Sequence, residues 1–418
     1  MRKNKEIDKN PLWTRDFTII TLGSVVSMIG NSLSGFAMSL MVLDYTSSAL
    51  FYAIYVMAFT FPQIVVPIFS GAILDRFSRR KTIYTLDYIS SIFYLSVGIL
   101  LHNGWFNYPI FALMVFILGC IQSMYQVAYQ SFYPMLISEG NFSKAYSVAS
   151  MLESVTVFIV PISTLVYNAV GIGPLMIANA VCFFIAATVE TQIKAKEKYV
   201  EDRKIDNKES KVKMMLSDTK AGFMYLWSEK GLFFIALYFL FSSFGGGVSN
   251  VSLLPYMKET MPNGEYYYLI IGGMMMLGRV VTSSWHYRHK LPIDKKFLIA
   301  FLVYIFISII EGSLLFLPLI MMFTLSFFSG CLGVTSYTIR ISATQSYVPD
   351  EKKGRFNGAF NMLSVLGALI GEGVAGVLST FMDMRFVMLT TQMVVLLAAV
   401  IIMGGKRRYV APIYNREQ

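Results

Sequence analysis

The chain has little charge for its length. Only 14% of its 418 residues are charged, whereas a soluble domain carries about 25%. The charges gather in short clusters, and nearly uncharged runs of about 18 to 27 residues separate them. A helix needs about 20 apolar residues to cross the hydrocarbon core of a bilayer. The low share of charged residues and the long uncharged runs therefore exclude an ordinary soluble domain and indicate a multi-pass membrane protein.

Cysteine and histidine are scarce as well. The three cysteines lie inside apolar runs without paired spacing, and the three histidines form no metal-ligand pattern, so neither a disulfide framework nor a metal site is expected. No phosphate-binding loop of the form G-x-x-x-x-G-K-[ST] is present, so ATP is not expected to supply energy. We find no catalytic constellation. We therefore predict a protein that is not an enzyme and that has no cofactor.

The apolar runs predict an all-α membrane protein with twelve transmembrane helices. A polar segment at 191–230 divides these runs into six and six, and a Gln-Ser pair precedes Pro134 after the fourth run and Pro349 after the tenth. Duplicated bundles of this kind are typical of transporters. We predict two pseudo-symmetric six-helix bundles, at 1–190 and 231–418, joined by a cytoplasmic linker at 191–230. The expected helices cover residues 17–43, 49–74, 82–101, 108–130, 146–168, 171–190, 231–254, 266–286, 297–316, 317–339, 356–380 and 384–404.

The distribution of basic residues favours one orientation in the membrane. With the N-terminus inside, the inner segments hold 32 of the 35 lysines and arginines, as expected for cytoplasmic loops. Both termini are therefore expected in the cytoplasm. Because the net charge of +10 is concentrated at these membrane borders, we do not expect a nucleic-acid partner.

The stretch "GAILDRFSRRKT", residues 71–82, places an acid and four bases between two apolar runs. It resembles the loop signature G-x-L-x-D-R-x-G-R-[RK] of the major facilitator superfamily, with Ser78 in place of the usual glycine. The segments "FPQIVVPIFSG" and "KKGRFNGAFNML", together with Asp87, resemble the macrolide-efflux-like branch of bacterial drug:proton antiporters. The candidate gating residues are Gly71, Asp75, Arg76, Arg79, Arg80 and Asp87.

The resemblance implies that the loop acid and the arginines form a charge relay that locks the inward-closed state. Asp87 lies about 9 Å past Lys81 by helix rise, and we expect it to join this network. The alternative is that the bases only orient the chain, but orientation by basic residues leaves the acid at Asp75 unexplained.

The resemblance also implies that the first, fourth, seventh and tenth helices line a cavity. Each of these runs carries polar side chains at a spacing of three and four residues, which places them on one helix face. Such a stripe is expected to face protein or water rather than lipid. The alternative, hydrogen bonds that join helices, suits the single serines better than the long polar side chains. The candidates for the substrate cavity are Asn31, Gln122, Gln126, Tyr129, Asn250 and Tyr337.

Acids within the apolar runs are candidates for proton coupling, because a carboxyl group in a dry site can hold a proton. We expect Glu153 and Glu372 to carry protons, and Arg279, at a depth similar to that of Glu153, to approach Glu153. Glu372 stands in "GALIGEGVAG", which resembles the antiporter motif G-x-x-x-G-P-x-x-G-G with Glu372 in the proline position. Glu311 lies near the outer end of its run and is expected at the level of the lipid headgroups.

These features predict a secondary active transporter that exports a hydrophobic or amphipathic small molecule in exchange for protons, by alternating access. We expect a monomer in the bacterial cytoplasmic membrane, surrounded by membrane lipid. The alternatives are a lysophospholipid flippase, a siderophore or peptide exporter, and a nutrient importer. A membrane sensor without transport activity is not favoured, because no segment is long enough for a soluble domain.

Overall fold

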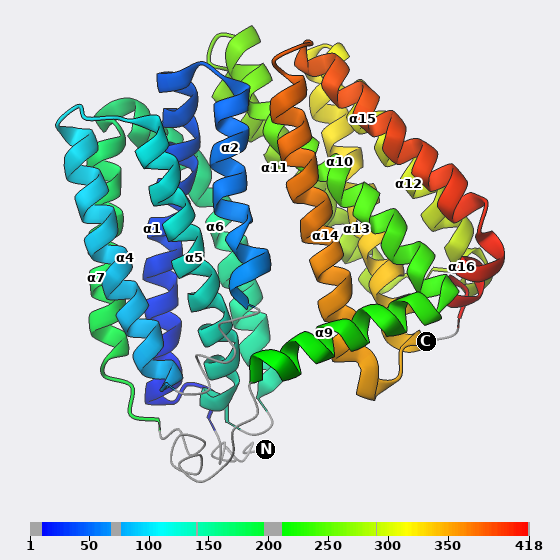
Figure 1. The fold of residues 1–418 in the computed structure, drawn as a ribbon, viewed down its shortest axis with the longest axis horizontal. Coiled ribbons are helices and arrows are strands. Elements are labelled where there is room, and N and C mark those ends of the chain that lie inside the picture. Colours follow the sequence, from blue (N-terminus) through cyan, green and yellow to red (C-terminus); the bar gives the residue numbers. More distant parts are fainter. Residues whose placement is uncertain (1–10, 68–76, 139–140, 196–210, 290, 417–418) are drawn as a thin grey trace, which may run out of the picture. The chain divides into compact units, whose positions relative to one another are not determined.

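The computed structural model describes residues 11–67, 77–138, 141–195, 211–289 and 291–416, and every regular element in these ranges is helical (Figure 1). Ten segments in the described part of the chain are long and apolar enough to cross a membrane. Two further long helices are α6 (Phe142–Val170) and α11 (Gly264–Arg288). The predicted all-α membrane fold is therefore confirmed, whereas the count of twelve spans stays a prediction.

The other long helices begin and end close to the expected apolar runs. The exceptions are α2, whose regular part ends at Thr60 although its run is expected to reach residue 74, and α13, which continues for two further turns, to Tyr347, and so places Arg340 inside a helix. These helices are α1 (Arg15–Thr46), α2 (Ala49–Thr60), α4 (Arg79–His102), α5 (Tyr108–Phe132), α7 (Ile172–Glu190), α10 (Lys230–Thr260), α12 (Lys296–Ser313), α13 (Leu319–Tyr347), α14 (Asp350–Leu378) and α15 (Met384–Ala398).

The chain folds into two compact units. Unit 1 comprises residues 1–41 and 65–212, and unit 2 comprises residues 42–64 and 213–418. The last turn of α1 and the whole of α2 thus belong to unit 2, together with α10 to α15. The second boundary, between Val212 and Lys213, falls inside the segment predicted to link the two bundles.

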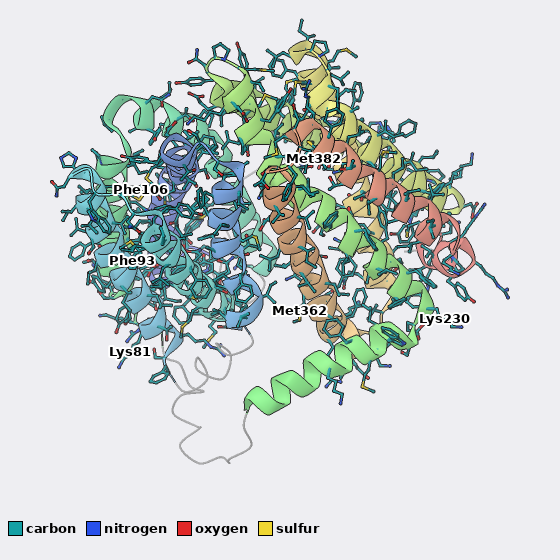
Figure 2. All side chains as sticks on the ribbon, turned by 45° about the horizontal axis from the view of Figure 1, so that its top comes forward. Lys81, Phe93, Phe106, Lys230, Met362 and Met382 are labelled. Carbon is teal, nitrogen blue, oxygen red and sulfur yellow. The ribbon has the colours of Figure 1, made fainter. Side chains whose placement is uncertain are left out.

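Helices α4 and α7 pack side by side in unit 1. The Ser91 hydroxyl of α4 donates to the Ala180 carbonyl of α7 at 2.7 Å. The rings of Tyr94 and Phe183 stack at a centroid distance of 5.5 Å. Side chains line α4 from Lys81, near its start, to Phe106, past its end (Figure 2). This contact brings residues about a hundred positions apart in the chain into one buried interface.

Glycines bring α10 and α14 into backbone contact in unit 2. A Cβ atom at Gly247 would stand 2.1 Å from the carbonyl oxygen of Ala368, and one at Gly371 would stand 2.0 Å from that of Phe244. Small residues permit such close crossings of membrane helices. The glycines of "GALIGEGVAG" therefore have a packing role, and they hold Glu372 close to α10.

Two helices of unit 2 lie outside the expected runs. Helix α9 (Lys211–Ser228) occupies much of the segment predicted as a linker, and a Cβ at its Gly222 would stand 2.5 Å from the Arg355 carbonyl oxygen. Helix α16 (Arg407–Tyr414) follows the last apolar run, and its Tyr414 hydroxyl shares a 2.8 Å hydrogen bond with that of Tyr304. Both helices therefore pack against the spanning helices of this unit.

Candidate functional site

Two acids meet in the interior of unit 1. Asp87 of α4 and Glu190 of α7 each have only 1% of their surface exposed. Their carboxyl groups lie within hydrogen-bonding reach of each other. On the α1 side, a Cβ at Gly23 would stand 2.8 Å from Glu190 Oε1, so this glycine makes room for the carboxyl group. The Tyr125 hydroxyl of α5 is buried nearby, beside Ser24. Four helices thus enclose the two acids.

The described arginines of the gating motif bind backbone carbonyl groups in unit 1. Arg79 Nη1 donates to the Ser131 carbonyl at 2.9 Å, and Arg80 Nη1 donates to the Ile193 carbonyl, just past the end of α7. Ser78 accepts a hydrogen bond from the Lys81 amide at 3.2 Å and caps α4, a role that serine performs well. These contacts anchor the start of α4. Gly71, Asp75 and Arg76 lie outside the described residues, so the charge relay stays a prediction.

The cavity candidates of unit 1 differ in their surroundings. Asn31 Oδ1 accepts a long hydrogen bond of 3.4 Å from the Tyr94 hydroxyl, which ties α1 to α4. Tyr129 stacks between two other tyrosines of the same face, with ring centroids 5.9 Å from Tyr125 and 5.3 Å from Tyr133. On α5, Gln122 is half-buried and Gln126 is exposed.

Glu372 and Asn250 meet in unit 2. The Glu372 side chain is 4% exposed, and its Oε1 accepts a hydrogen bond from Asn250 Nδ2 at 3.5 Å. Thr60 of α2 is the other polar group beside this carboxyl group. The structure therefore joins a predicted proton carrier to a predicted cavity residue, while Tyr337 lies apart from this pair with 56% of its surface exposed.

A second acid of unit 2, Glu311, lies among polar side chains from three other helices. Its carboxyl oxygens accept hydrogen bonds from Gln392 Nε2 at 2.9 Å, Ser249 Oγ at 3.4 Å and Ser329 Oγ at 3.5 Å. Ser249 is 11 residues before the end of α10, and Ser329 is 10 residues after the start of α13, so both lie about 15 Å along their helices. Glu311 is thus enclosed among polar side chains of its own unit, and its expected place at the level of the lipid headgroups stays a prediction.

Arg279 and Glu153 are predicted to approach each other. Arg279 is exposed on α11, its Nη2 lies 4.0 Å from Met275 Sδ, and Glu311 is near enough to attract it electrostatically. The Glu153 side chain lies outside the described part of the structure. Their pairing therefore stays a prediction.

An aromatic enclosure surrounds Arg340 of α13. Its guanidinium carbon lies 4.7 Å from the ring centroid of Phe360, 5.0 Å from that of Phe239 and 5.4 Å from that of Tyr337. Its buried Nε has no hydrogen-bond partner among the described residues. Cation–π contacts of this kind stabilise a guanidinium group and leave its N–H donors available.

Sequence reasoning missed Glu190, and it missed the surroundings of Glu311 and Arg340. Glu190 is the last residue of an apolar run, where it looks like a boundary residue. The signal that could have found it is its register, because Glu190 continues the face that carries Phe183 and Ala187, both of which are buried.

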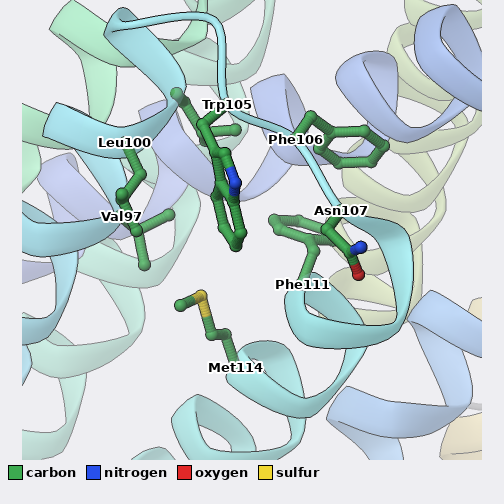
Figure 3. A pocket seen from close by; sticks show the side chains of 8 residues that line it. Val97, Leu100, Trp105, Phe106, Asn107, Phe111 and Met114 are labelled. Atoms are coloured by element: carbon green, nitrogen blue, oxygen red, sulfur yellow. The ribbon is translucent and has the colours of Figure 1, made fainter.

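The apolar pocket in Figure 3 is not a substrate site. It lies where α4 and α5 are connected, between side chains that include Val97, Trp105 and Phe111. Its volume of about 10 Å³ is roughly that of one water molecule. A small molecule of the size expected for a transport substrate would not fit there.

Long apolar helices that enclose carboxyl groups and an arginine are features of a multi-pass membrane protein with ionisable groups buried between its helices. The chain belongs to the Major Facilitator Superfamily, whose family model matches residues 20–372. This is a family of transporters and not of enzymes.

Individual relatives are distant. The chain is 24% identical over 279 residues to the uncharacterized MFS-type transporter YkuC of Bacillus subtilis (strain 168), and the match covers 64% of each protein. Among solved structures, it is similar to a point mutant of the nucleoside transporter NupG, with a TM-score of 0.61, 10% identity, and coverage of 94% of this chain and 99% of that one. A bacterial homologue of the iron transporter ferroportin in an inward-facing state gives a TM-score of 0.66, with 13% identity and coverage of 93% and 98%. At these identities the two structures support the fold alone.

Proposed function

We propose that the protein is a secondary active transporter that exports a hydrophobic or amphipathic small molecule in exchange for protons. It would work by alternating access, in the bacterial cytoplasmic membrane, with both termini in the cytoplasm. The resemblance to the macrolide-efflux-like branch and the bias of basic residues toward the inner loops support these details.

The buried Glu372 is the observation that carries this proposal. Its carboxyl group has neutral polar neighbours, Asn250 and Thr60, and a second oxygen that is buried without a hydrogen bond from the described residues. An ionised carboxylate in such a place is very unfavourable, so a bound proton would stabilise this state. A change of conformation that admits water would favour release of the proton. The carboxyl group can thus exchange its proton as the transporter changes state.

Transport into everted membrane vesicles tests the proposal. We expect uptake of at least one compound from a panel of hydrophobic and amphipathic dyes, and we expect an imposed pH gradient to accelerate it. Glu372→Gln should lose that acceleration while counterflow exchange of the same dye survives. Glu259→Gln, an exposed acid of α10, is the matched control and should behave like the wild type.

Uptake without any response to the gradient would contradict proton coupling. Accumulation in right-side-out vesicles instead would contradict export and would favour a nutrient importer. The panel should also include a peptide and a siderophore, because uptake of either would favour the alternative that the protein exports compounds of that class.

A lysophospholipid flippase is a second candidate, and Arg340 favours it. A guanidinium held between three aromatic rings can bind a phosphate through its N–H groups, and the rings can contact an acyl chain. Flipping of a fluorescent lysophospholipid in proteoliposomes tests this candidate. Arg340→Lys keeps the charge but loses the planar donor group, so it should slow flipping and leave transport of a cationic dye unchanged.

A further inference from the structure

The acids of unit 1 suggest where a proton is bound. Asp87 and Glu190 face each other across the contact between α4 and α7, and three of their four oxygens are buried without a hydrogen-bond donor among the described residues: Asp87 Oδ2 and both oxygens of Glu190. A carboxylate is only an acceptor, whereas a protonated carboxyl group also donates. One proton between these groups would form a hydrogen bond that joins one oxygen of each acid.

The charged and titratable groups around the two acids do not replace this proton. Tyr125 faces them from α5, and its hydroxyl is neutral at ordinary pH. Arg80, two turns before Asp87 on α4, directs Nη1 to the Ile193 carbonyl. Beyond the end of α7, Asp16 of α1 accepts a hydrogen bond from the backbone amide of Lys194 at 3.1 Å. Two like charges that are this close and this deeply buried cannot both be ionised without a large penalty.

We propose that Asp87 and Glu190 form a proton-binding site in which the two carboxyl groups share one proton, and that its release and rebinding is a coupling step of transport. This inference rests on the proton-coupled transport proposed above. In the protonated state the shared proton joins α4 to α7. Loss of the proton leaves two like charges in the interface, which favours separation of the helices or entry of water.

The position of the site connects it to the predicted substrate cavity. Tyr125 stands between the two acids and Tyr129, with their rings stacked 5.9 Å apart. Gln122 lies one turn away on the same helix. Ser24, beside the Tyr125 hydroxyl, lies about 10 Å along α1 from Asn31 by helix rise. A change in the packing of α4 against α7 would therefore shift the polar faces of α1 and α5, which carry the predicted cavity residues.

Infrared spectroscopy of the full-length protein in lipid nanodiscs tests the shared proton directly, because the carbonyl stretch of a protonated carboxyl group differs from that of a carboxylate. We expect Asp87→Asn and Glu190→Gln each to remove one protonated-carboxyl band, the same band in both, and the double variant to remove no more. Glu372→Gln should leave this band in place. No change in either single variant, or separate bands lost in the two, would overturn the shared proton.

Thermal unfolding gives a second readout that needs no substrate. As the pH rises, loss of the shared proton should lower the Tm of the wild type, since the folded state then holds two buried like charges. Glu190→Gln and Asp87→Asn should each reduce this decrease of the Tm with rising pH, because the amide of the new side chain donates to the remaining carboxylate. A pH dependence identical to that of the wild type in both variants would count against the site.

Proteoliposomes with ethidium as the probe test the coupling itself. The imposed pH gradient should accelerate ethidium transport by the wild type, and Glu190→Gln should lose the acceleration while keeping ethidium counterflow. If Glu190→Gln responds to the gradient as the wild type does, the two acids have only a structural role and the coupling step is refuted. If the wild type ignores the gradient, proton-coupled transport fails, and the infrared result still decides whether the proton is shared.

Discussion

Gly371 of α14 lies directly against the carbonyl oxygen of Phe244 in α10, at a place where a Cβ atom would stand 2.0 Å from that oxygen. No side chain fits this contact without displacement of a helix backbone. Glu372 is the next residue after Gly371 on α14, and its partner Asn250 lies on α10. The geometry of this polar pair therefore depends on how closely the two helices cross. Close packing and a polar site are thus built by neighbouring residues of one motif.

Gly371→Ala is expected to destabilise the protein, because the methyl group must push α14 away from α10. Overpacking of this kind costs about 1–3 kcal/mol. The measurement is the Tm in detergent, followed by intrinsic fluorescence or by a thiol-reactive dye. Gly246→Ala is the matched control on α10, because a Cβ there meets no atom within 4 Å. Equal melting temperatures for Gly371→Ala and the wild type would show that α10 and α14 can move apart at this contact without loss of stability.

Gln392→Met should destabilise unit 2 by removing the shortest hydrogen bond to Glu311, at 2.9 Å. An acceptor that is left buried without its donor costs about 1–3 kcal/mol. Ser329→Ala removes a donor at 3.5 Å, near the limit for a hydrogen bond, and should cost less. Urea or thermal unfolding of both variants checks the order, and a larger loss for Ser329→Ala would contradict it.

Asp383 should stabilise α15 more strongly at neutral pH than in acid. Its Oδ1 accepts from the Arg385 amide at 2.8 Å, and the Arg385 guanidinium beside it holds the pKa of this carboxyl below its ordinary value. Because this pKa is depressed, the stabilisation is present at neutral pH and is lost as the pH falls through the pKa of the folded state. Asp383→Ala should lose an N-cap worth about 0.5–2 kcal/mol at neutral pH, and less in acid.

The control for this prediction is Asp383→Asn, since asparagine keeps a capping oxygen and loses the charge. The Tm of the three proteins across a pH series is the measurement. A difference between Asp383→Ala and the wild type that stays constant down to acid pH would exclude a role for the charge.

Asp75→Asn tests the gating loop. The variant should fold and insert into the membrane as the wild type does, and it should nearly abolish dye transport in everted vesicles, because the proposed charge relay needs a negative charge. Glu259→Gln serves again as the exposed control. Transport at the wild-type rate by Asp75→Asn would mean that the loop only orients the chain.

Much of the helical architecture follows from local properties of the sequence. A helix that crosses a bilayer must be apolar over about 20 residues wherever it packs, so the spans and the fold class can be read from composition and run length. For the same reason the observed α1, α4 and α5 extend their expected runs by only a few residues. Helix α9 was not expected, because its 18 residues carry no long apolar run, and its close contact with the Arg355 carbonyl is a tertiary one.

The sequence by itself determined that this protein is a multi-pass membrane protein of the Major Facilitator type and that Glu372 lies in a glycine-rich helix. Only the tertiary structure decided which groups meet. Asp87 and Glu190 are separated by more than a hundred residues, and nothing in either apolar run marks the other as its neighbour. For the same reason the sequence does not show that Gln392, Ser249 and Ser329, from three other helices, surround Glu311. The burial of a single polar residue depends on helix pairing, and helix pairing is a property of side-chain packing between distant segments rather than of any one segment.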